Sequence, residues 1–239
     1  MLSVVIPCYN EEKNIPLIIE RLVFVIKDRL DIEIILVNNG SKDDTDKVMI
    51  QEIAKTGRKY FKIAKVFENQ GYGYGILSGL KVASGDVLAW THADMQTDPE
   101  DVLRAYDTYE QQSNECIFIK GNRKNRHFME AFFTFGMQMI VFFFLKSYLS
   151  DINAQPKLFS RKFYSLYLSK DAPYDFSLDL YAMYQAKKNG YKILTIPVYF
   201  AKREYGEAKG GGGSWKNKIK LIKRTLKYIL EFSDRIKNK

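Results

Sequence analysis

The first half of this chain alternates short runs of β-branched residues with stretches of helical spacing, and this alternation constrains the fold more than any other feature. The segments typical of strands are 4–6, 32–37, 61–66 and 86–90. The segments typical of helices are 15–26, 44–54 and 75–83. Strands that alternate with helices predict a parallel sheet with right-handed crossovers. The expected fold class is therefore α/β, with a mostly parallel sheet flanked by helices.

Polar residues follow three of these strands at their carboxyl ends. They are Pro7-Cys8-Tyr9-Asn10, Asn38-Asn39-Gly40-Ser41 and His92-Ala93-Asp94. Open parallel sheets bind ligands beyond the carboxyl ends of their strands. The sequence therefore predicts a ligand site along this edge of the sheet.

The second half of the chain is less regular and ends in a basic helix. Residues 128–145 form an apolar, aromatic-rich helix candidate that falls short of the ~20 apolar residues of a membrane span. This helix suits either a core or a membrane interface. Residues 215–239 have an apolar face opposite lysines, and from Lys216 onward they carry most of the net charge of +9. Such a tail attracts nucleic acid, anionic lipid or a phosphate-bearing substrate.

Length and cysteine content indicate one domain in a reducing compartment. The 239 residues suit a single large α/β domain. The two cysteines, Cys8 and Cys116, lie far apart in apolar runs, which argues against a disulfide framework. The start of the chain lacks the pattern of a secretory signal, so we expect a cytoplasmic protein.

Four short motifs follow one another along the chain in an order that resembles a known family. They occupy residues 4–12, 36–45, 69–73 and 83–100. Together they resemble the inverting glycosyltransferases of family 2, which have the Rossmann-like GT-A fold, and in particular the polyprenyl-phosphate (dolichol-phosphate mannose synthase-like) branch. The segments 120–123, 151–153 and 203–209 extend the resemblance to nearly the whole chain.

The resemblance implies the reaction and its participants. A sugar would pass from a nucleotide diphosphate to a polyprenyl phosphate or lipid-linked saccharide, in cell-surface glycan synthesis. Within the single domain, 1–239, residues 1–100 would be the nucleotide-binding half, 101–214 the acceptor half and 215–239 the basic amphipathic helix. The cofactor would be a divalent cation, Mn²⁺ or Mg²⁺.

The resemblance also implies a donor site. Its expected residues are Pro7, Tyr9, Asn10, Glu11, Asn38, Asn39, Gly71, Gly73, Ala93, Asp94, Arg123, Arg203 and Lys209. Three alternatives stay open. The two asparagines would otherwise cap the next turn and helix, the two glycines would form a plain helix-start turn, and the segment around Lys209 would be a solvated charged loop.

The metal-binding Asp-x-Asp motif of the family appears here as His92-Ala93-Asp94, with Gln96 two residues on. Alternate positions of an extended segment project to one side, so His92, Asp94 and Gln96 are the candidate metal ligands. Asp94 offers the hard anionic oxygen that Mg²⁺ or Mn²⁺ prefers. His92 departs from the motif, and it either favours manganese, hydrogen-bonds a phosphate or the acceptor, or plays no part.

Two carboxylates are the candidate catalytic groups, Asp94 and Asp179. A hydroxyl acceptor needs a general base, whereas a phosphate acceptor is already anionic. Asp179 matches the acidic position that serves as this base in relatives with hydroxyl acceptors, and nearby Asp175 is an alternative. Asp179 would otherwise orient the donor or a helix.

The basic helix and the aromatic run 132–145 suggest attachment to anionic lipid. We therefore expect a peripheral protein at the inner face of the membrane, and leave open whether it forms a homo-oligomer. Two other function classes compete: a sugar nucleotidyltransferase and a non-catalytic nucleotide-sugar binder. Nucleic acid is not an expected partner, because the basic tail lacks a base-reading motif.

Overall fold

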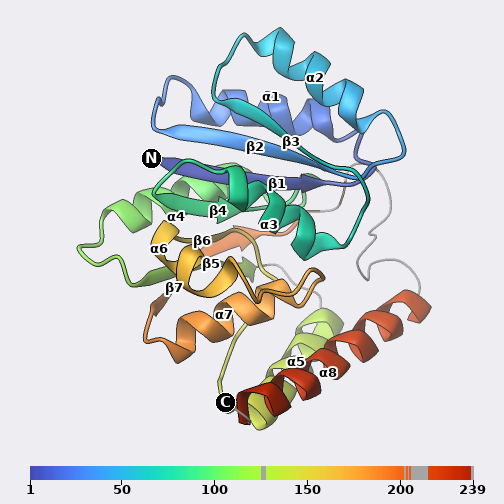
Figure 1. Cartoon of the computed structure of the whole chain (residues 1–239), viewed down its shortest axis with the longest axis vertical. Helices are drawn as coiled ribbons and strands as arrows, with labels where there is room; N and C mark the ends of the chain where they lie inside the picture. The colour runs from blue at the N-terminus through green and yellow to red at the C-terminus, as the bar shows by residue number, and fades with distance from the viewer. Residues whose placement is uncertain (125–127, 202, 204, 206–214, 238–239) are drawn as a thin grey trace.

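A computed structural model describes residues 1–124, 128–201, 203, 205 and 215–237, with backbone alone for 128–135 and 215–221. Within these ranges one sheet of seven strands has the order β3-β2-β1-β4-β6-β5-β7 (Figure 1). The strands are β1 (Leu2–Cys8), β2 (Ile32–Asn39), β3 (Phe61–Val66), β4 (Val87–Trp90), β5 (Ile117–Lys124), β6 (Lys157–Ser160) and β7 (Lys192–Tyr199).

The sheet is mostly parallel, which confirms the predicted fold class. Strand β1 lies parallel to β2 and β4, and β5 lies parallel to β7. Strand β6 runs antiparallel to both of its neighbours, β4 and β5. The sequence did not predict β6, because four residues beginning with a lysine are too few to show a period.

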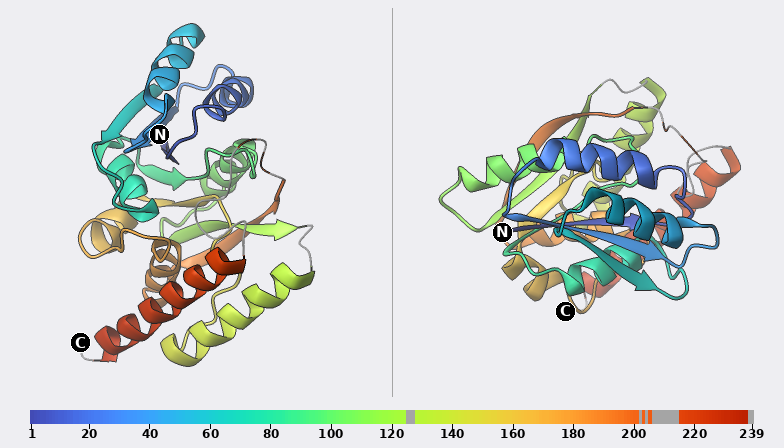
Figure 2. Two further views of the ribbon diagram at one scale, coloured as in Figure 1. Left: turned by 90° about the vertical axis from the view of Figure 1, so that its right-hand side faces the viewer. Right: turned by 90° about the horizontal axis from the view of Figure 1, so that it is seen from above.

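Helices cover both faces of the sheet, because alternate strand residues point to opposite sides. Val4 and Ile6 face one core cluster, which also contains residues of α1 (Ile15–Ile26), α2 (Thr45–Thr56) and α4 (Glu100–Glu110). Val5 faces a second cluster with residues of α3 (Tyr72–Val82) and α7 (Leu178–Lys188). A short helix, α6 (Arg161–Phe163), and the π-helical turn Tyr164–Leu168 complete that layer. Figure 2 shows the three layers in two further views.

Two long helices, α5 (Phe128–Leu145) and α8 (Trp215–Lys237), lie side by side at one end of the molecule (Figures 1 and 2). The Ser233 hydroxyl of α8 donates to the Phe144 carbonyl of α5 over 3.0 Å. Phe232 packs against Tyr181 and Tyr184 of α7, which joins the pair to the domain. Among the described helices, none combines the length and the apolar character that a bilayer crossing requires.

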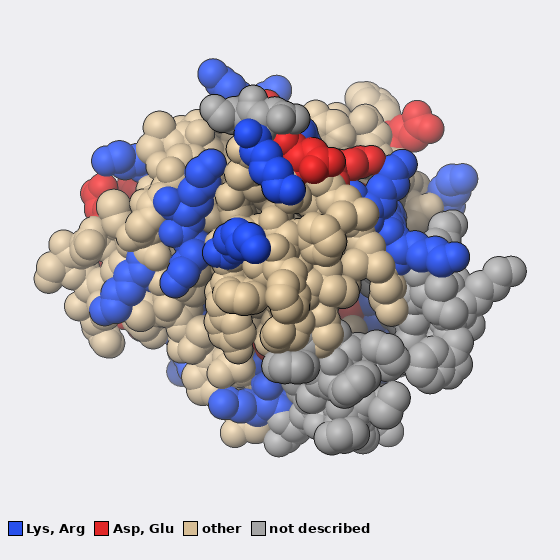
Figure 3. All heavy atoms as spheres, turned by 90° about the horizontal axis from the view of Figure 1, so that it is seen from below, with Lys and Arg blue, Asp and Glu red and all other residues tan. Residues whose placement is uncertain are grey.

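The outer surface of this helix pair mixes aromatic and basic side chains. Phe142, Phe143 and Phe144 are exposed although they are aromatic. Lys223 and Lys227 of α8 are exposed as well. Figure 3 views the molecule from below and shows Lys and Arg side chains scattered over a mostly uncharged surface, with some Asp and Glu side chains near the top of the view.

Candidate functional site

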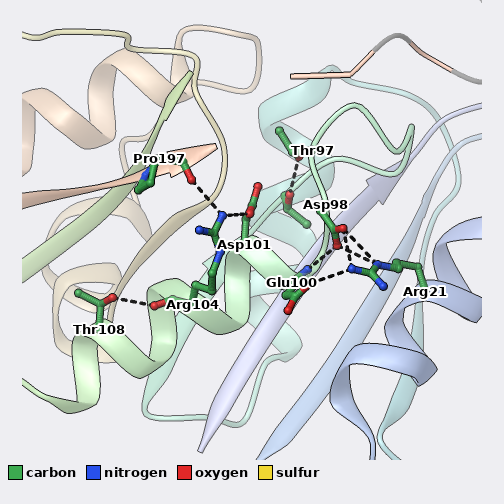
Figure 4. Close-up of polar contacts among 9 residues, drawn as sticks. Arg21, Thr97, Asp98, Glu100, Asp101, Arg104, Thr108 and Pro197 are labelled. Atoms are coloured by element: carbon green, nitrogen blue, oxygen red, sulfur yellow. Dashed lines mark hydrogen bonds and ion pairs between the residues drawn. The ribbon is translucent and has the colours of Figure 1, made fainter. Parts of the chain in front are cut away.

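The loop between β4 and α4 carries the residues that match the metal motif, and it is fixed at both ends (Figure 4). The hydroxyls of Thr91 and Thr97 hydrogen-bond across its neck at 3.3 Å. The Arg21 guanidinium of α1 donates to both carboxylate oxygens of Asp98 at 2.8–3.1 Å, and to Glu100 at 2.8 Å. The β4–α4 loop is therefore tied to α1 as well as to the strand and helix that it connects.

Asp94 lies within this loop beside a guanidinium that comes from the far end of the chain. Its Oδ2 accepts a hydrogen bond from Arg203 Nη2 at 2.5 Å, and its Oδ1 accepts from the backbone N–H of Gln96 at 3.2 Å. Arg203 Nη1 lies 3.5 Å from Oε1 of Glu11, a residue that follows β1. All three side chains are at most 15% exposed, so the guanidinium joins two buried carboxylates.

His92 lies among charges of both signs. Desolvation lowers the pKa of its imidazole, and the positive charges of Lys157 and Arg123 lower it further, against the opposing effect of Asp94 and Asp179. A lowered pKa keeps the ring neutral near pH 7, which is the form that ligates metals or accepts a hydrogen bond.

Arg123, at the end of β5, is held by Asp151. Its Nε donates to Asp151 Oδ1 at 2.9 Å, and its backbone N–H donates to Oδ2 at 2.8 Å. Burial alone raises the Asp151 pKa, but the hydrogen bonds and charge of Arg123 keep that pKa below its usual value. Arg123 thus keeps a fixed position at the same edge of the sheet.

Asp179, in the first turn of α7, accepts two hydrogen bonds on one oxygen. Lys157 Nζ lies 3.1 Å from Oδ1, and Gln155 Nε2 donates to the same atom at 2.9 Å. Gln155 Nε2 also lies 3.0 Å from the hydroxyl of Tyr72 at the start of α3. Lys157 is fully buried, and desolvation lowers its pKa although Asp179 works to raise it. This network links β6, α3 and α7.

A hollow of about 280 Å³ opens beyond the ends of β1, β2 and β3. The residues lining it are Tyr9, Gly40, Ser41, Lys42, Phe67, Glu68 and Asn69. Asn10 holds two of the lining residues, because its N–H donates to Ser41 Oγ at 3.0 Å and its Oδ1 accepts from the Lys42 N–H at 2.8 Å. The segment from Tyr9 to Glu11 therefore runs from this hollow to the carboxylate of Glu11 beside Arg203.

The two asparagines at the end of β2 make contacts inside the protein. Asn38 Oδ1 accepts from the Ser41 N–H at 3.0 Å, and Asn38 Nδ2 donates to Asp46 at 3.3 Å. Asn39 Nδ2 donates to the Gly71 carbonyl at 3.0 Å. Asn38 thus stabilises the turn after β2, as the capping alternative expected, and its predicted contact with a base stays a prediction.

The two predicted glycine positions lie close to a neighbouring backbone. A Cβ at Gly71, where φ is +122°, would lie 2.4 Å from the Tyr174 carbonyl oxygen, and one at Gly73 would lie 2.5 Å from the Pro173 carbonyl oxygen. These contacts give both glycines a packing role at the start of α3, and their approach to a nucleotide stays a prediction.

The remaining predicted site residues differ in what the structure says of them. The side chain of Ala93 is buried in a core cluster, so only its backbone is left to contact a nucleotide-sugar donor. Pro7 pairs in register with Val37 near the end of β1. The Gln96 side-chain amide donates to the Ala201 carbonyl at 3.4 Å. Lys209 lies outside the described residues.

The candidate metal ligands have chemistry that suits a divalent cation. Asp94 would supply one anionic oxygen and the neutral ring of His92 a second ligand atom. The described residues contain no cluster of three or more His, Cys, Asp or Glu side chains arranged for a metal. These two groups would suit a cation whose remaining ligands came from a bound diphosphate and water.

Sequence reasoning missed Lys157, Gln155 and Tyr72. Lys157 stands immediately before the apolar residues Leu158 and Phe159, and a lysine next to such a run is the signal that could have drawn attention to it. Its partner Asp179 was identified only through the family resemblance, because the 21 residues between them carry no periodic pattern.

The chain was compared with known proteins. The family model described as glycosyl transferase family 2 matches residues 3–166. Human dolichyl-phosphate beta-glucosyltransferase is 26% identical over 220 residues, which cover 85% of this chain and 68% of the human protein. The undecaprenyl-phosphate 4-deoxy-4-formamido-L-arabinose transferase of Photorhabdus laumondii is 33% identical over 132 residues. That match covers 54% of this chain and only 40% of the bacterial relative.

Solved structures show the same fold at low identity. Glucosyl-3-phosphoglycerate synthase from Mycobacterium tuberculosis, in complex with UDP, has a TM-score of 0.74 at 15% identity over 98% of this chain and 80% of that one. A mannosyltransferase from Pyrobaculum calidifontis, in complex with GDP-Man and Mn²⁺, has a TM-score of 0.64 at 15% identity over 98% and 73%. With the family match, which covers more than half of the chain, these findings show that the protein belongs to glycosyl transferase family 2, the nucleotide-sugar-dependent glycosyltransferases of GT-A fold.

Proposed function

We propose that this enzyme transfers a sugar, with inversion at the anomeric carbon, from a nucleoside diphosphate to a polyprenyl phosphate at the inner face of a membrane, in cell-surface glycan synthesis. The family assignment excludes the sugar nucleotidyltransferase and the non-catalytic binder as readings of the whole chain. The proposed donor, acceptor, metal and membrane attachment are argued from the contacts, charges and exposure of individual side chains.

The observation that carries the proposal is the continuity between the hollow at Tyr9 and the charged cluster at Asp94. The hollow has room for a base and ribose, and Tyr9 offers an aromatic ring there. Two residues further on, Glu11 meets Arg203 and, through it, Asp94. A nucleoside in the hollow would place its diphosphate along Tyr9–Glu11, toward Arg203 and Asp94.

The charges of the site support a requirement for a divalent cation. Arg203 is paired with Asp94, Arg123 with Asp151, and Lys157 with Asp179. A diphosphate brings further negative charge into these paired groups. A divalent cation held by Asp94, with His92 and Gln96 as its other candidate ligands, would neutralise the charge that develops on the leaving diphosphate.

The described residues support a phosphate acceptor over a hydroxyl. The relatives named above carry dolichyl phosphate and undecaprenyl phosphate in their names. A phosphate oxygen attacks without losing a proton, so it needs no general base. One oxygen of Asp179 is already occupied by Lys157 and Gln155, which suits a carboxylate that orients the site. A lipid-linked saccharide remains the alternative acceptor, and in that case Asp179 would act as the base.

The surface of α5 and α8 supports attachment to the membrane that holds such an acceptor. Phe142, Phe143 and Phe144 of α5 are exposed, and so are Lys223 and Lys227 of the neighbouring helix α8. Aromatic side chains partition into the interfacial layer of a bilayer, and each nearby lysine adds ~1 kcal/mol of attraction to anionic lipid.

A two-stage experiment tests the proposed function. Thermal shifts with UDP, GDP, CDP and dTDP, each with Mn²⁺, Mg²⁺ or chelator, identify the base and metal, because a ligand that binds only the native state raises its stability. The sugar nucleotide so identified is then offered with undecaprenyl phosphate or dolichyl phosphate. We expect a lipid-phosphate sugar of inverted anomeric configuration, detected by NMR. Transfer to a saccharide hydroxyl and not to lipid phosphate would refute the proposed acceptor.

A further inference from the structure

The contacts of Arg203 place a cation on the carboxylate that the family resemblance assigns to a metal. The guanidinium donates to Asp94 Oδ2 at 2.5 Å and lies 3.5 Å from Glu11 Oε1. Its side chain is 15% exposed, and those of Asp94 and Glu11 are 7% and 10% exposed. Asp94 therefore has a positively charged partner from which water is largely excluded.

Backbone contacts on both sides hold Arg203 in this position. Before it, the Ala201 N–H donates to the Gln96 carbonyl at 2.8 Å, and the Gln96 side chain donates back to the Ala201 carbonyl at 3.4 Å. After it, Asn14 Nδ2 donates to the Tyr205 carbonyl at 3.3 Å. Asn14 also donates to Glu11 at 2.5 Å. The pair with Asp94 is thus part of a set of contacts and not an isolated surface ion pair.

A guanidinium and a divalent cation cannot both occupy one carboxylate oxygen, and their like charges repel at short range. Arg203 would have to leave Asp94 for the carboxylate to coordinate a cation through Oδ2. Leaving Asp94 takes from this largely buried guanidinium the nearer of the two carboxylates with which it pairs among the described residues, a cost that is offset when another anion takes the place of Asp94. A diphosphate is such an anion, and guanidinium groups bind phosphate oxygens through paired hydrogen bonds.

We infer that Arg203 competes with the divalent cation for Asp94, so that the cation binds tightly only together with the nucleoside diphosphate. This inference rests on the proposed donor site and adds an order of binding to it. Arg203 suppresses cation binding to the empty enzyme, and the diphosphate relieves this suppression by drawing Arg203 away. Because coupling between two ligands is reciprocal, the cation tightens the nucleotide by the same factor as the nucleotide tightens the cation.

The test measures Mn²⁺ binding by electron paramagnetic resonance on the full chain, with and without UDP or GDP. In the wild type, we expect the nucleotide to tighten Mn²⁺ by roughly 5- to 150-fold, the usual range of such coupling. Arg203→Gln should bind Mn²⁺ alone about tenfold more tightly than the wild type. In this variant the nucleotide should therefore tighten Mn²⁺ binding by a smaller factor than in the wild type. Arg203→Lys keeps the positive charge but loses the paired N–H donors of the guanidinium, so its affinity for Mn²⁺ alone should lie between those of the wild type and Arg203→Gln.

Arg123→Gln is the matched control, because it removes the same charge from the same edge of the sheet but its partner is Asp151. If both glutamine variants tighten Mn²⁺ equally, the effect is one of general charge and the inference is wrong. If Arg203→Gln binds Mn²⁺ alone no more tightly than the wild type, the inference is wrong while the proposed donor site stands. If the wild type binds no Mn²⁺ even with nucleotide, the proposed metal-dependent donor site fails and takes this inference with it. Circular dichroism confirms that each variant is folded.

Discussion

The buried pair of Lys157 and Asp179 gives a prediction whose size follows from its geometry. Lys157 is fully buried and Asp179 is 2% exposed, with 3.1 Å between Nζ and Oδ1. Removing one partner of such a pair leaves an uncompensated charge and costs about 3–5 kcal/mol. We therefore expect Asp179→Asn and Lys157→Met each to lower the free energy of unfolding by about that amount. The double variant should lose much less than the sum, because it leaves neither charge behind.

The measurement is urea unfolding of the wild type, both single variants and the double variant, followed by circular dichroism at 25 °C. Desolvation lowers the Lys157 pKa in the folded protein, so the unfolded state binds more protons and stability rises with pH toward the ordinary lysine pKa. Removing Asp179 removes an effect that raises this pKa, so the rise should be steeper in Asp179→Asn. Single-variant losses below ~1 kcal/mol, or losses that simply add in the double variant, would refute the reasoning.

Three further predictions concern other parts of the molecule. Glu33 is 4% exposed, and its pKa is lowered from 4.5 to about 2. Its carboxylate therefore stabilises the fold by about 3 kcal/mol above pH 4.5, and this stabilisation should be lost as the pH falls toward 2. In urea unfolding, Glu33→Gln should make the free energy of unfolding depend less on pH over this range. Gly73→Ala would place a Cβ 2.5 Å from the Pro173 carbonyl and should cost about 1–3 kcal/mol, while Gly136→Ala, with no atom within 4 Å, should be neutral or stabilising in thermal melts. Lys223→Ala and Lys227→Ala should each weaken flotation with anionic vesicles by about fivefold, with little change on neutral vesicles, and unchanged flotation in both would rule out the electrostatic contribution.

Much of the structure of residues 1–100 was predictable, because the sequence signals there are local and repeat. The apolar positions Ile15, Ile18, Ile19, Leu22 and Ile26, spaced for a helix, are all buried in α1. The predicted strands at 32–37 and 86–90 differ from β2 and β4 by only one or two residues at an end. Parallel strands joined by helices leave few topologies, so the sheet edge that carries the site followed from the same pattern.

The contacts that organise the site were not predictable in the same way. Arg203 and Asp94 are 109 residues apart in the sequence, and their pairing depends on where the segment after β7 crosses the β4–α4 loop. Strand β6 and its buried Lys157 were not predicted, because a four-residue antiparallel strand between parallel strands is too short to show a periodic sequence pattern. The role expected of Gly71 illustrates the same limit, since only the fold reveals the Tyr174 backbone against which it packs.

The central claim is that one diphosphate lies between the segment Tyr9–Glu11 and Asp94. The most direct measurement is a crystal structure of the protein with Mn²⁺ and the nucleoside diphosphate that stabilises it most, with anomalous data at the manganese edge. We expect the manganese peak at Asp94 and the base in the hollow lined by Tyr9 and Asn69. Manganese or diphosphate bound away from Asp94, or a base outside that hollow, would contradict the account.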